Sequence, residues 1–167
     1  MPKISVRFLL AIALLGVGAS TLSTHSARAQ SAGIFDGLAG SWAGEGSIKE
    51  NSGATERMRC VATYDVAGGG DTLNQNLKCA SDSYKFELHT QLQNQGGSIV
   101  GNWSETTRNV EGGISGHGSK GLIQVLARGQ TFSANVSVTT HGSQQAVEIR
   151  AQSSDLSNIS ITLHRSH

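Results

Sequence analysis

The sequence has little proline, few aromatic residues and few charges. Its one proline is Pro2, aromatic residues make up 5% of the 167 positions, and charged residues make up 15%. No window combines strong helix formers with apolar residues spaced three and four apart, so a helical bundle is excluded. Lys and Arg are scattered singly, without the basic stripe that binds phosphate, so we expect no nucleic-acid partner.

Long apolar runs are also scarce, with one exception near the N-terminus. Residues 8–19 form an apolar run that follows Lys3 and Arg7, and this run is shorter than the roughly 20 residues that a membrane-spanning helix needs. A polar stretch then closes on Ala27-Arg28-Ala29. This order predicts a signal peptide over residues 1–29, cleaved on export to the periplasm or out of the cell. An uncleaved N-terminal anchor is the alternative.

The residues left after that cleavage fit a single domain. They carry ten basic and twelve acidic side chains, so the exported chain is nearly neutral. At about 140 residues, roughly two thirds of the unfolded surface can be buried, and a second domain would lack a core. We expect residues 30–40 to form an N-terminal segment with a short helical turn, and residues 41–167 to form the domain itself.

Apolar residues recur at every second position along this domain. Over residues 56–66 they include Met58, Cys60 and Tyr64, and over residues 73–79 only Gln75 interrupts the apolar face. A period of two predicts strands with one buried face. Ten strands are expected, over residues 41–49, 56–66, 73–79, 84–92, 99–107, 110–118, 121–127, 132–140, 145–151 and 159–165.

Short glycine-rich stretches separate these strands, among them Gly68-Gly69-Gly70-Asp71 and Gly96-Gly97. Such stretches are typical of tight turns between antiparallel strands, and no connection is long enough for a crossover. A meander of this kind removes its unpaired edges by closing on itself. The predicted fold is therefore all-β: a single antiparallel up-and-down β-barrel of about 8–10 strands, with a short N-terminal helical turn.

Integral outer-membrane barrels share this alternation, but they carry an apolar outer band between two aromatic girdles. Two Trp, two Tyr and three Phe follow residue 29, too few for two girdles. We therefore do not expect an integral membrane protein.

The two cysteines, Cys60 and Cys79, fall on the inward faces of successive predicted strands. Export takes them to an oxidising compartment, where such pairs are normally joined, so we predict a disulfide. A zinc site is the alternative, but zinc needs three or four ligands and no histidine lies near the pair.

Two short segments carry a resemblance to a known group. Gly40-Ser41-Trp42 opens the first strand, and Arg165 ends the last one in phase with Ile161 and Leu163. In lipocalins and their calycin relatives, which include the avidin type, a Gly-x-Trp strand packs its tryptophan beneath the barrel against an arginine of the last strand. The sequence resembles this group, and the resemblance implies a structural pairing of Trp42 with Arg165. The Thr-Asp-Tyr pattern and the final helix of lipocalins proper are absent.

A second resemblance is to small periplasmic inhibitors of bacterial metalloproteases. These also begin with a Gly-x-Trp strand and carry two cysteines that bridge neighbouring strands, the order that Gly40, Trp42, Cys60 and Cys79 show. In that family a segment before the eight-stranded barrel enters the protease cleft. The resemblance implies such a role for residues 30–33 and an envelope protein as partner, although this chain is longer by about two strands.

The interior of a barrel of this size holds either packed side chains or one small ligand. Tyr64, Phe86, Trp103 and Phe132 fall on the predicted inward face, where rings and a phenol would hold an apolar or amphipathic molecule. A core filled by the same rings is the alternative. An empty interior of about 300 Å³ or more would favour the ligand.

Catalytic, metal and cofactor sites are not expected. No Gly-x-Ser-x-Gly elbow is present, and the histidines after residue 29 fall mostly on outward positions or turns. Glu105 shares the parity of Trp103, so a buried carboxyl with a raised pKa is one possibility, and an exposed strand end is the one we favour. We predict a binding protein for a small hydrophobic molecule, with a protein-binding module such as a protease inhibitor as the alternative.

Overall fold

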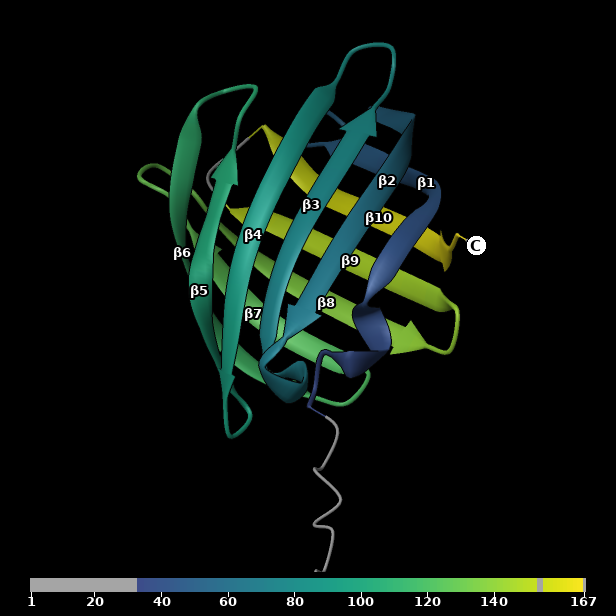
Figure 1. The fold of residues 1–167 in the computed structure, drawn as a ribbon. Helices are drawn as coiled ribbons and strands as arrows, with labels where there is room; N and C mark the ends of the chain where they lie inside the picture. Colours follow the sequence, from purple (N-terminus) through teal and green to yellow (C-terminus); the bar gives the residue numbers. More distant parts are fainter. Residues whose placement is uncertain (1–32, 153–154, 167) are drawn as a thin grey trace, which may run out of the picture.

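Ten antiparallel strands account for most of the chain (Figure 1). The computed structural model describes residues 33–152 and 155–166. The signal peptide predicted over residues 1–29 lies outside these ranges. The elements are η1 (Asp36–Leu38), β1 (Gly40–Glu50), β2 (Thr55–Ala67), η2 (Gly68–Gly70), β3 (Thr72–Ala80), β4 (Lys85–Gln95), β5 (Ser98–Glu105), β6 (Val110–Ser119), β7 (Leu122–Arg128), β8 (Ser133–His141), β9 (Gln144–Gln152) and β10 (Leu156–Arg165), where η marks a single 3-10 turn.

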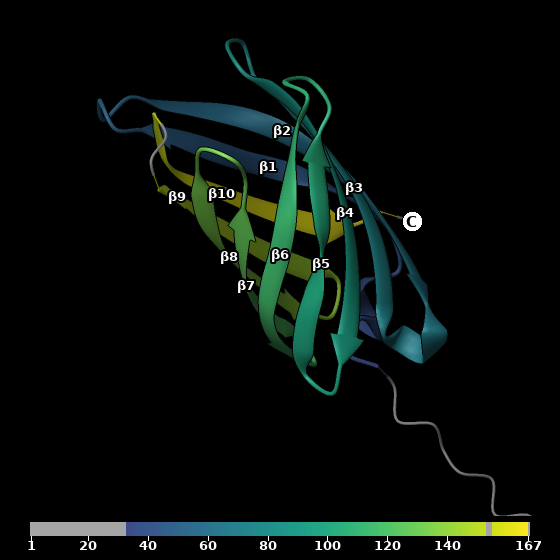
Figure 2. The same cartoon turned by 90° about the vertical axis from the view of Figure 1, so that its left-hand side faces the viewer.

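Each strand pairs with the next along the chain, and β1 pairs with β10, so the sheet closes into a barrel. Strands β2–β5 form one wall, which crosses the wall of β7–β10 behind it (Figure 1). The side view shows β5 and β6 at the bend between these two walls (Figure 2). The predicted fold class, an antiparallel up-and-down barrel, is confirmed.

The alternation in sequence produces the walls directly. In β2, every second residue from Met58 to Tyr64 is buried and the residues between them are exposed. All ten predicted strands are present, with ends that differ from the prediction by at most three residues. The largest difference at a strand start is in β10, which begins at Leu156 rather than Ile159 because it pairs with Glu50 across an irregularity in β1.

The N-terminal segment covers one end of the barrel. Phe35 and Leu38 are 0% and 4% exposed, and the Phe35 amide donates a hydrogen bond of 3.0 Å to the carbonyl of Gly70 in η2. The indole Nε1 of Trp42 donates to the carbonyl of Leu38 over 2.8 Å. The opposite end, called the distal end below, is formed by the β1–β2, β3–β4, β5–β6 and β7–β8 connections.

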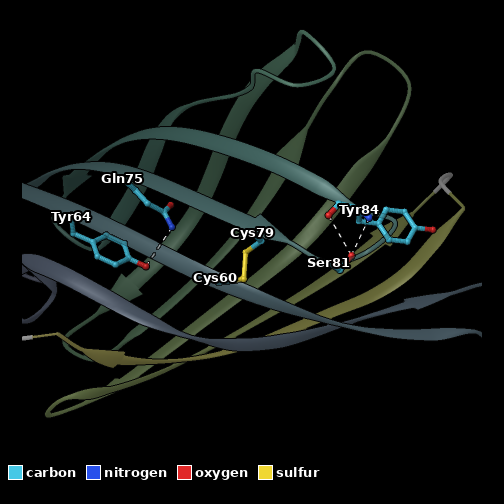
Figure 3. Close-up of a disulfide and its surroundings, with 6 residues drawn as sticks. All are labelled: Cys60, Tyr64, Gln75, Cys79, Ser81 and Tyr84. Atoms are coloured by element: carbon cyan, nitrogen blue, oxygen red, sulfur yellow. Dashed lines mark hydrogen bonds between the residues drawn. A yellow bond between two sulfur atoms is a disulfide. The ribbon is translucent and has the colours of Figure 1, made fainter.

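Cys60 and Cys79 are directly opposite in β2 and β3 and are joined by a disulfide (Figure 3). The predicted bond is confirmed. Both residues are 2% exposed, so the bridge lies within the barrel core rather than on its surface. No helix in the described ranges is long and apolar enough to cross a membrane.

Candidate functional site

The barrel encloses a cavity of about 510 Å³. All ten strands contribute to its lining: β1 and β2 supply one residue each, Ile48 and Tyr64, and every other strand supplies two or more. The cavity extends from Leu38 of η1 to the distal end, where Tyr84 and Arg108 border it. Its volume lies within the range of about 300–1,000 Å³ that is usual for small-molecule sites.

All four aromatic residues singled out from the sequence border this cavity. Tyr64, Phe86 and Trp103 project from β2, β4 and β5, and Phe132 stands immediately before β8. The rings of Trp103 and Phe132 meet with their centroids 5.4 Å apart and a tilt of 55°. The indole Nε1 of Trp103 donates to the carbonyl of Arg128 over 3.3 Å, which fixes the ring against the β7–β8 connection.

The wall opposite β2–β5 is aliphatic and incompletely packed. Val136, Val138 and Ile149 line the cavity but are only half-buried, although they point into the barrel. By contrast, Ile161 and Leu163, toward the η1 end, are 2% and 0% exposed. Packing is therefore dense near η1 and loose in the body of the barrel, and the interior is partly hollow rather than filled.

A buried polar group lies on the other wall. The hydroxyl of Tyr64 donates to Oε1 of Gln145 over 2.5 Å, and it accepts a long hydrogen bond of 3.4 Å from Nε2 of Gln75 (Figure 3). Gln145 is fully buried, and its Nε2 donates to the hydroxyl of Thr140. Burial raises the pKa of Tyr64 well above its ordinary value, and this effect exceeds the lowering by the hydrogen bonds that Tyr64 makes with Gln145 and Gln75. Tyr64 is therefore a neutral phenol across the physiological range.

Glu105 is buried at the distal end, at 7% exposure, so the exposed position favoured above is wrong. Its carboxylate accepts hydrogen bonds from the backbone amides of Glu87, Thr107 and Arg108, and one of 2.6 Å from the Thr107 hydroxyl. Desolvation alone would raise its pKa, but these donors hold the pKa below its ordinary value. The raised pKa considered for a buried carboxyl is therefore wrong as well.

Arg108 and Tyr84 also border the cavity at its distal end, and each interacts with a carboxylate. Nη1 of Arg108 lies 3.5 Å from Oε2 of Glu105. The Tyr84 hydroxyl donates to Glu50 over 2.6 Å, and this bond to an anion raises the pKa of Tyr84. The Tyr84 phenol thus stays protonated at the distal end.

No group of three or more metal-ligating side chains occurs in residues 33–152 and 155–166. His117, His141 and His164 are exposed on the outside of the barrel. His89 is half-buried and lies 3.4 Å from Glu87, an acid neighbour that the sequence analysis did not identify. His167 lies outside the described ranges.

The segment that the inhibitor resemblance assigns to a protease cleft, residues 30–33, is described only at Gly33. The amide of Gly33 donates to the carbonyl of Gly69 over 3.0 Å, and its α-carbon packs closely against Gly70. Gly33 is therefore attached to the η1 end of the barrel. The barrel also has ten strands, against eight in those inhibitors.

Two solved structures are similar to this fold. The crystal structure of Rv2717c from M. tuberculosis matches with a TM-score of 0.63 and 13% identity, over 78% of this chain and 94% of its own. The S-type phycobiliprotein lyase CPES from Guillardia theta matches with a TM-score of 0.55 and 12% identity, over 80% of this chain and 90% of its own. No protein-family model and no curated protein matches the sequence. These likenesses concern the fold alone, and together with the closed ten-stranded barrel they fit a calycin-like barrel.

Proposed function

We propose that this protein is an exported barrel that binds a small hydrophobic or amphipathic molecule in its interior. One observation carries the proposal: a cavity of about 510 Å³ bordered by rings on one wall and by half-buried aliphatic side chains on the other. Exposed apolar surface inside a barrel is unfavourable until something covers it, and a ligand of matching size removes that surface from water. Tyr64, Phe86, Trp103 and Phe132 are its proposed contacts.

The fold comparisons support this proposal only in a general way. Calycin-like barrels surround an interior that can be filled or hollow, and the function depends on the residues inside rather than on the fold. Here the incompletely packed side chains of Val136, Val138 and Ile149 favour the hollow case.

Export is the second part of the proposal. The order of charged, apolar and small residues over positions 1–29 is that of a cleaved signal peptide. The disulfide between Cys60 and Cys79 is compatible with an oxidising compartment. We propose that the exported chain consists of the segment over residues 30–40 and the barrel over residues 41–167, located in the periplasm or outside the cell.

Titration of the neutral dye N-phenylnaphthylamine into the protein tests the binding function. We expect dye fluorescence to rise and tryptophan fluorescence to be quenched. The quenching should be lost in Trp103→Phe, because Trp103 is the tryptophan that borders the cavity. Native mass spectrometry of protein purified from its host should show a co-purifying small molecule. Absence of dye binding and of any bound molecule would contradict the proposal.

Two matched double variants separate the interior from the outer surface. Val136→Phe with Val138→Phe adds two rings inside the cavity, and we expect it to weaken dye binding at least tenfold because it fills the space. Val61→Phe with Val100→Phe places the same change at positions that are 55% and 37% exposed, and should leave dye binding intact. Equal effects of the two pairs would place the dye on the surface and refute the interior site.

A further inference from the structure

Four cavity-lining residues form a single row across the wall of β2–β5. Tyr64 is the register partner of Gln75, Gln75 is that of Thr90, and Thr90 is that of Trp103. All four border the cavity, so a phenol, a carboxamide, a hydroxyl and an indole stand side by side on one wall. Figure 3 shows the first two, pointing toward each other from β2 and β3. We call this row the polar rung.

The middle of the polar rung has hydrogen-bonding capacity that the protein does not use. Thr90 is 5% exposed, and its hydroxyl has no hydrogen-bond partner among the described residues, although it borders the cavity. The carboxamide of Gln75 makes one long bond of 3.4 Å to Tyr64. A buried polar group without a partner costs free energy, which a ligand carrying a matching group would recover.

The facing wall contributes one polar group to the rung, Gln145 of β9, which is already bonded to Tyr64 and does not line the cavity. Every cavity-lining side chain on β7–β9 is isoleucine, valine or alanine, among them Val136, Val138 and Ile149. A bound molecule would therefore meet hydrogen-bonding groups on one side and hydrocarbon on the other.

Charge is absent from the polar rung itself. Tyr64 stays neutral because burial raises its pKa, and amide, hydroxyl and indole groups do not ionise near neutral pH. The one cation that borders the cavity within the described ranges is Arg108, in the β5–β6 connection at the distal end. A charged ligand group placed at the polar rung would lose its hydration without gaining a counter-ion.

We propose that the polar rung recognises a neutral hydroxyl or carbonyl group on an otherwise apolar ligand. This inference rests on the binding function proposed above and specifies the ligand class. Gln75 and Thr90 each supply a donor and an acceptor, so a hydroxyl or a carbonyl can be satisfied there, and Trp103 provides an adjacent flat apolar surface. The apolar remainder of the ligand packs on the aliphatic wall.

Competition against bound N-phenylnaphthylamine at pH 7 tests this selectivity. The competitors are dodecanol, dodecanoate and dodecylammonium, which share a chain and differ in the polar group. We expect dodecanol to displace the dye at a concentration at least tenfold lower than the other two, because only its group is neutral. Tighter binding of dodecanoate that is lost in Arg108→Gln, or tighter binding of dodecylammonium, would overturn the inference and place the polar group at the distal end.

Variants of the rung provide the second arm. Thr90→Val removes the hydroxyl with little change of shape, and Gln75→Leu removes the carboxamide. Each should weaken dodecanol binding roughly fivefold to tenfold more than it changes dye binding. Thr63→Val, at an exposed position of the neighbouring strand, is the matched control and should change neither. Unchanged dodecanol binding in both rung variants would overturn the inference while the binding function stands, whereas failure of the wild-type protein to bind the dye would remove both.

Discussion

The guanidinium carbon of Arg165 lies 4.5 Å from the centre of the Trp42 ring. The two residues are register partners in β1 and β10, the strands that close the barrel. Nη2 of Arg165 also donates to the carbonyl of Gly37 over 2.6 Å, and Nη1 donates to the carbonyl of Ala39. One side chain near the C-terminus thus holds both the tryptophan of the first strand and the N-terminal segment that covers the barrel end.

Replacing Arg165 should therefore lower the free energy of unfolding. A cation over an aromatic ring contributes about 0.5–2 kcal/mol, and each hydrogen bond from a charged donor contributes about 1.5–3 kcal/mol. We expect Arg165→Met to lose about 2 kcal/mol in urea denaturation followed by tryptophan fluorescence. Arg165→Lys should recover only part of this loss because an ammonium lacks the planar fork of donors. Arg150→Met, at an exposed position of β9, is the control, and an equal loss there would contradict the assigned role.

Reduction of the disulfide should destabilise the barrel without changing its fold. Cys60 and Cys79 are 19 residues apart in sequence, and closing a loop of this length stabilises by about 3 kcal/mol in the chain-entropy model. We expect the urea midpoint to fall when a reductant is present. The double variant Cys60→Ala with Cys79→Ala should have a low midpoint that the reductant does not change. A wild-type midpoint insensitive to complete reduction would show that the bond contributes little.

The fold could be predicted from sequence because its signal is local. Alternation in β2, where Met58 and Tyr64 are buried and Arg57 and Thr63 are not, fixes which face turns inward and is visible without the rest of the chain. Glycine pairs such as Gly96 and Gly97, with φ of 65° and 94°, mark the hairpins in the same way. The short connections then indicate the number and order of the strands. Closure follows because it removes the unpaired edges of the meander.

The state of the interior could not be predicted in this way. Whether Val136 and Phe86 touch or leave space depends on the distance between the walls, which no single strand encodes. The pKa of Glu105 depends on the amide of Glu87 on the neighbouring strand and on that of Arg108 in the β5–β6 turn, and neither contact is visible in the sequence of β5 itself. The polar rung did leave a trace, because Gln75 interrupts an otherwise apolar face, and such an interruption is the sequence signal that indicates a polar group facing a barrel interior.

The hydrogen bonds of Glu105 should make the stability depend on pH. Its folded pKa lies below the ordinary value of 4.5, so the stabilisation is fully present above that value and is lost as pH falls through the folded pKa. We expect Glu105→Gln to lose about 2 kcal/mol at pH 7, since a neutral amide with one accepting oxygen replaces a charged acceptor with two. The difference from the wild-type protein should shrink as the pH is lowered below 4.5.

Urea denaturation at several pH values measures this difference. Glu111→Gln, at an exposed position of β6, removes the same charge without buried donors and serves as the control. A difference between wild type and Glu105→Gln that stays constant down to acid pH would show that the carboxylate charge is not what stabilises the turn.

Two adjacent glycines in β6 offer a sharp test of how the barrel bends. A Cβ at Gly112 would lie 1.8 Å from the carbonyl oxygen of Arg128 and 2.8 Å from Nε1 of Trp103, whereas a Cβ at Gly113 would meet nothing within 4 Å. The missing side chain at Gly112 therefore lets β6 approach β7 closely and leaves room for the indole. We expect Gly112→Ala to destabilise the protein by about 2 kcal/mol or more and to shift Trp103 fluorescence. Gly113→Ala should be neutral or slightly stabilising, because alanine restricts the unfolded chain. Equal stabilities of the two variants would mean that β6 and β7 can move apart at Gly112 without cost. The close approach of these strands would then not shape the cavity.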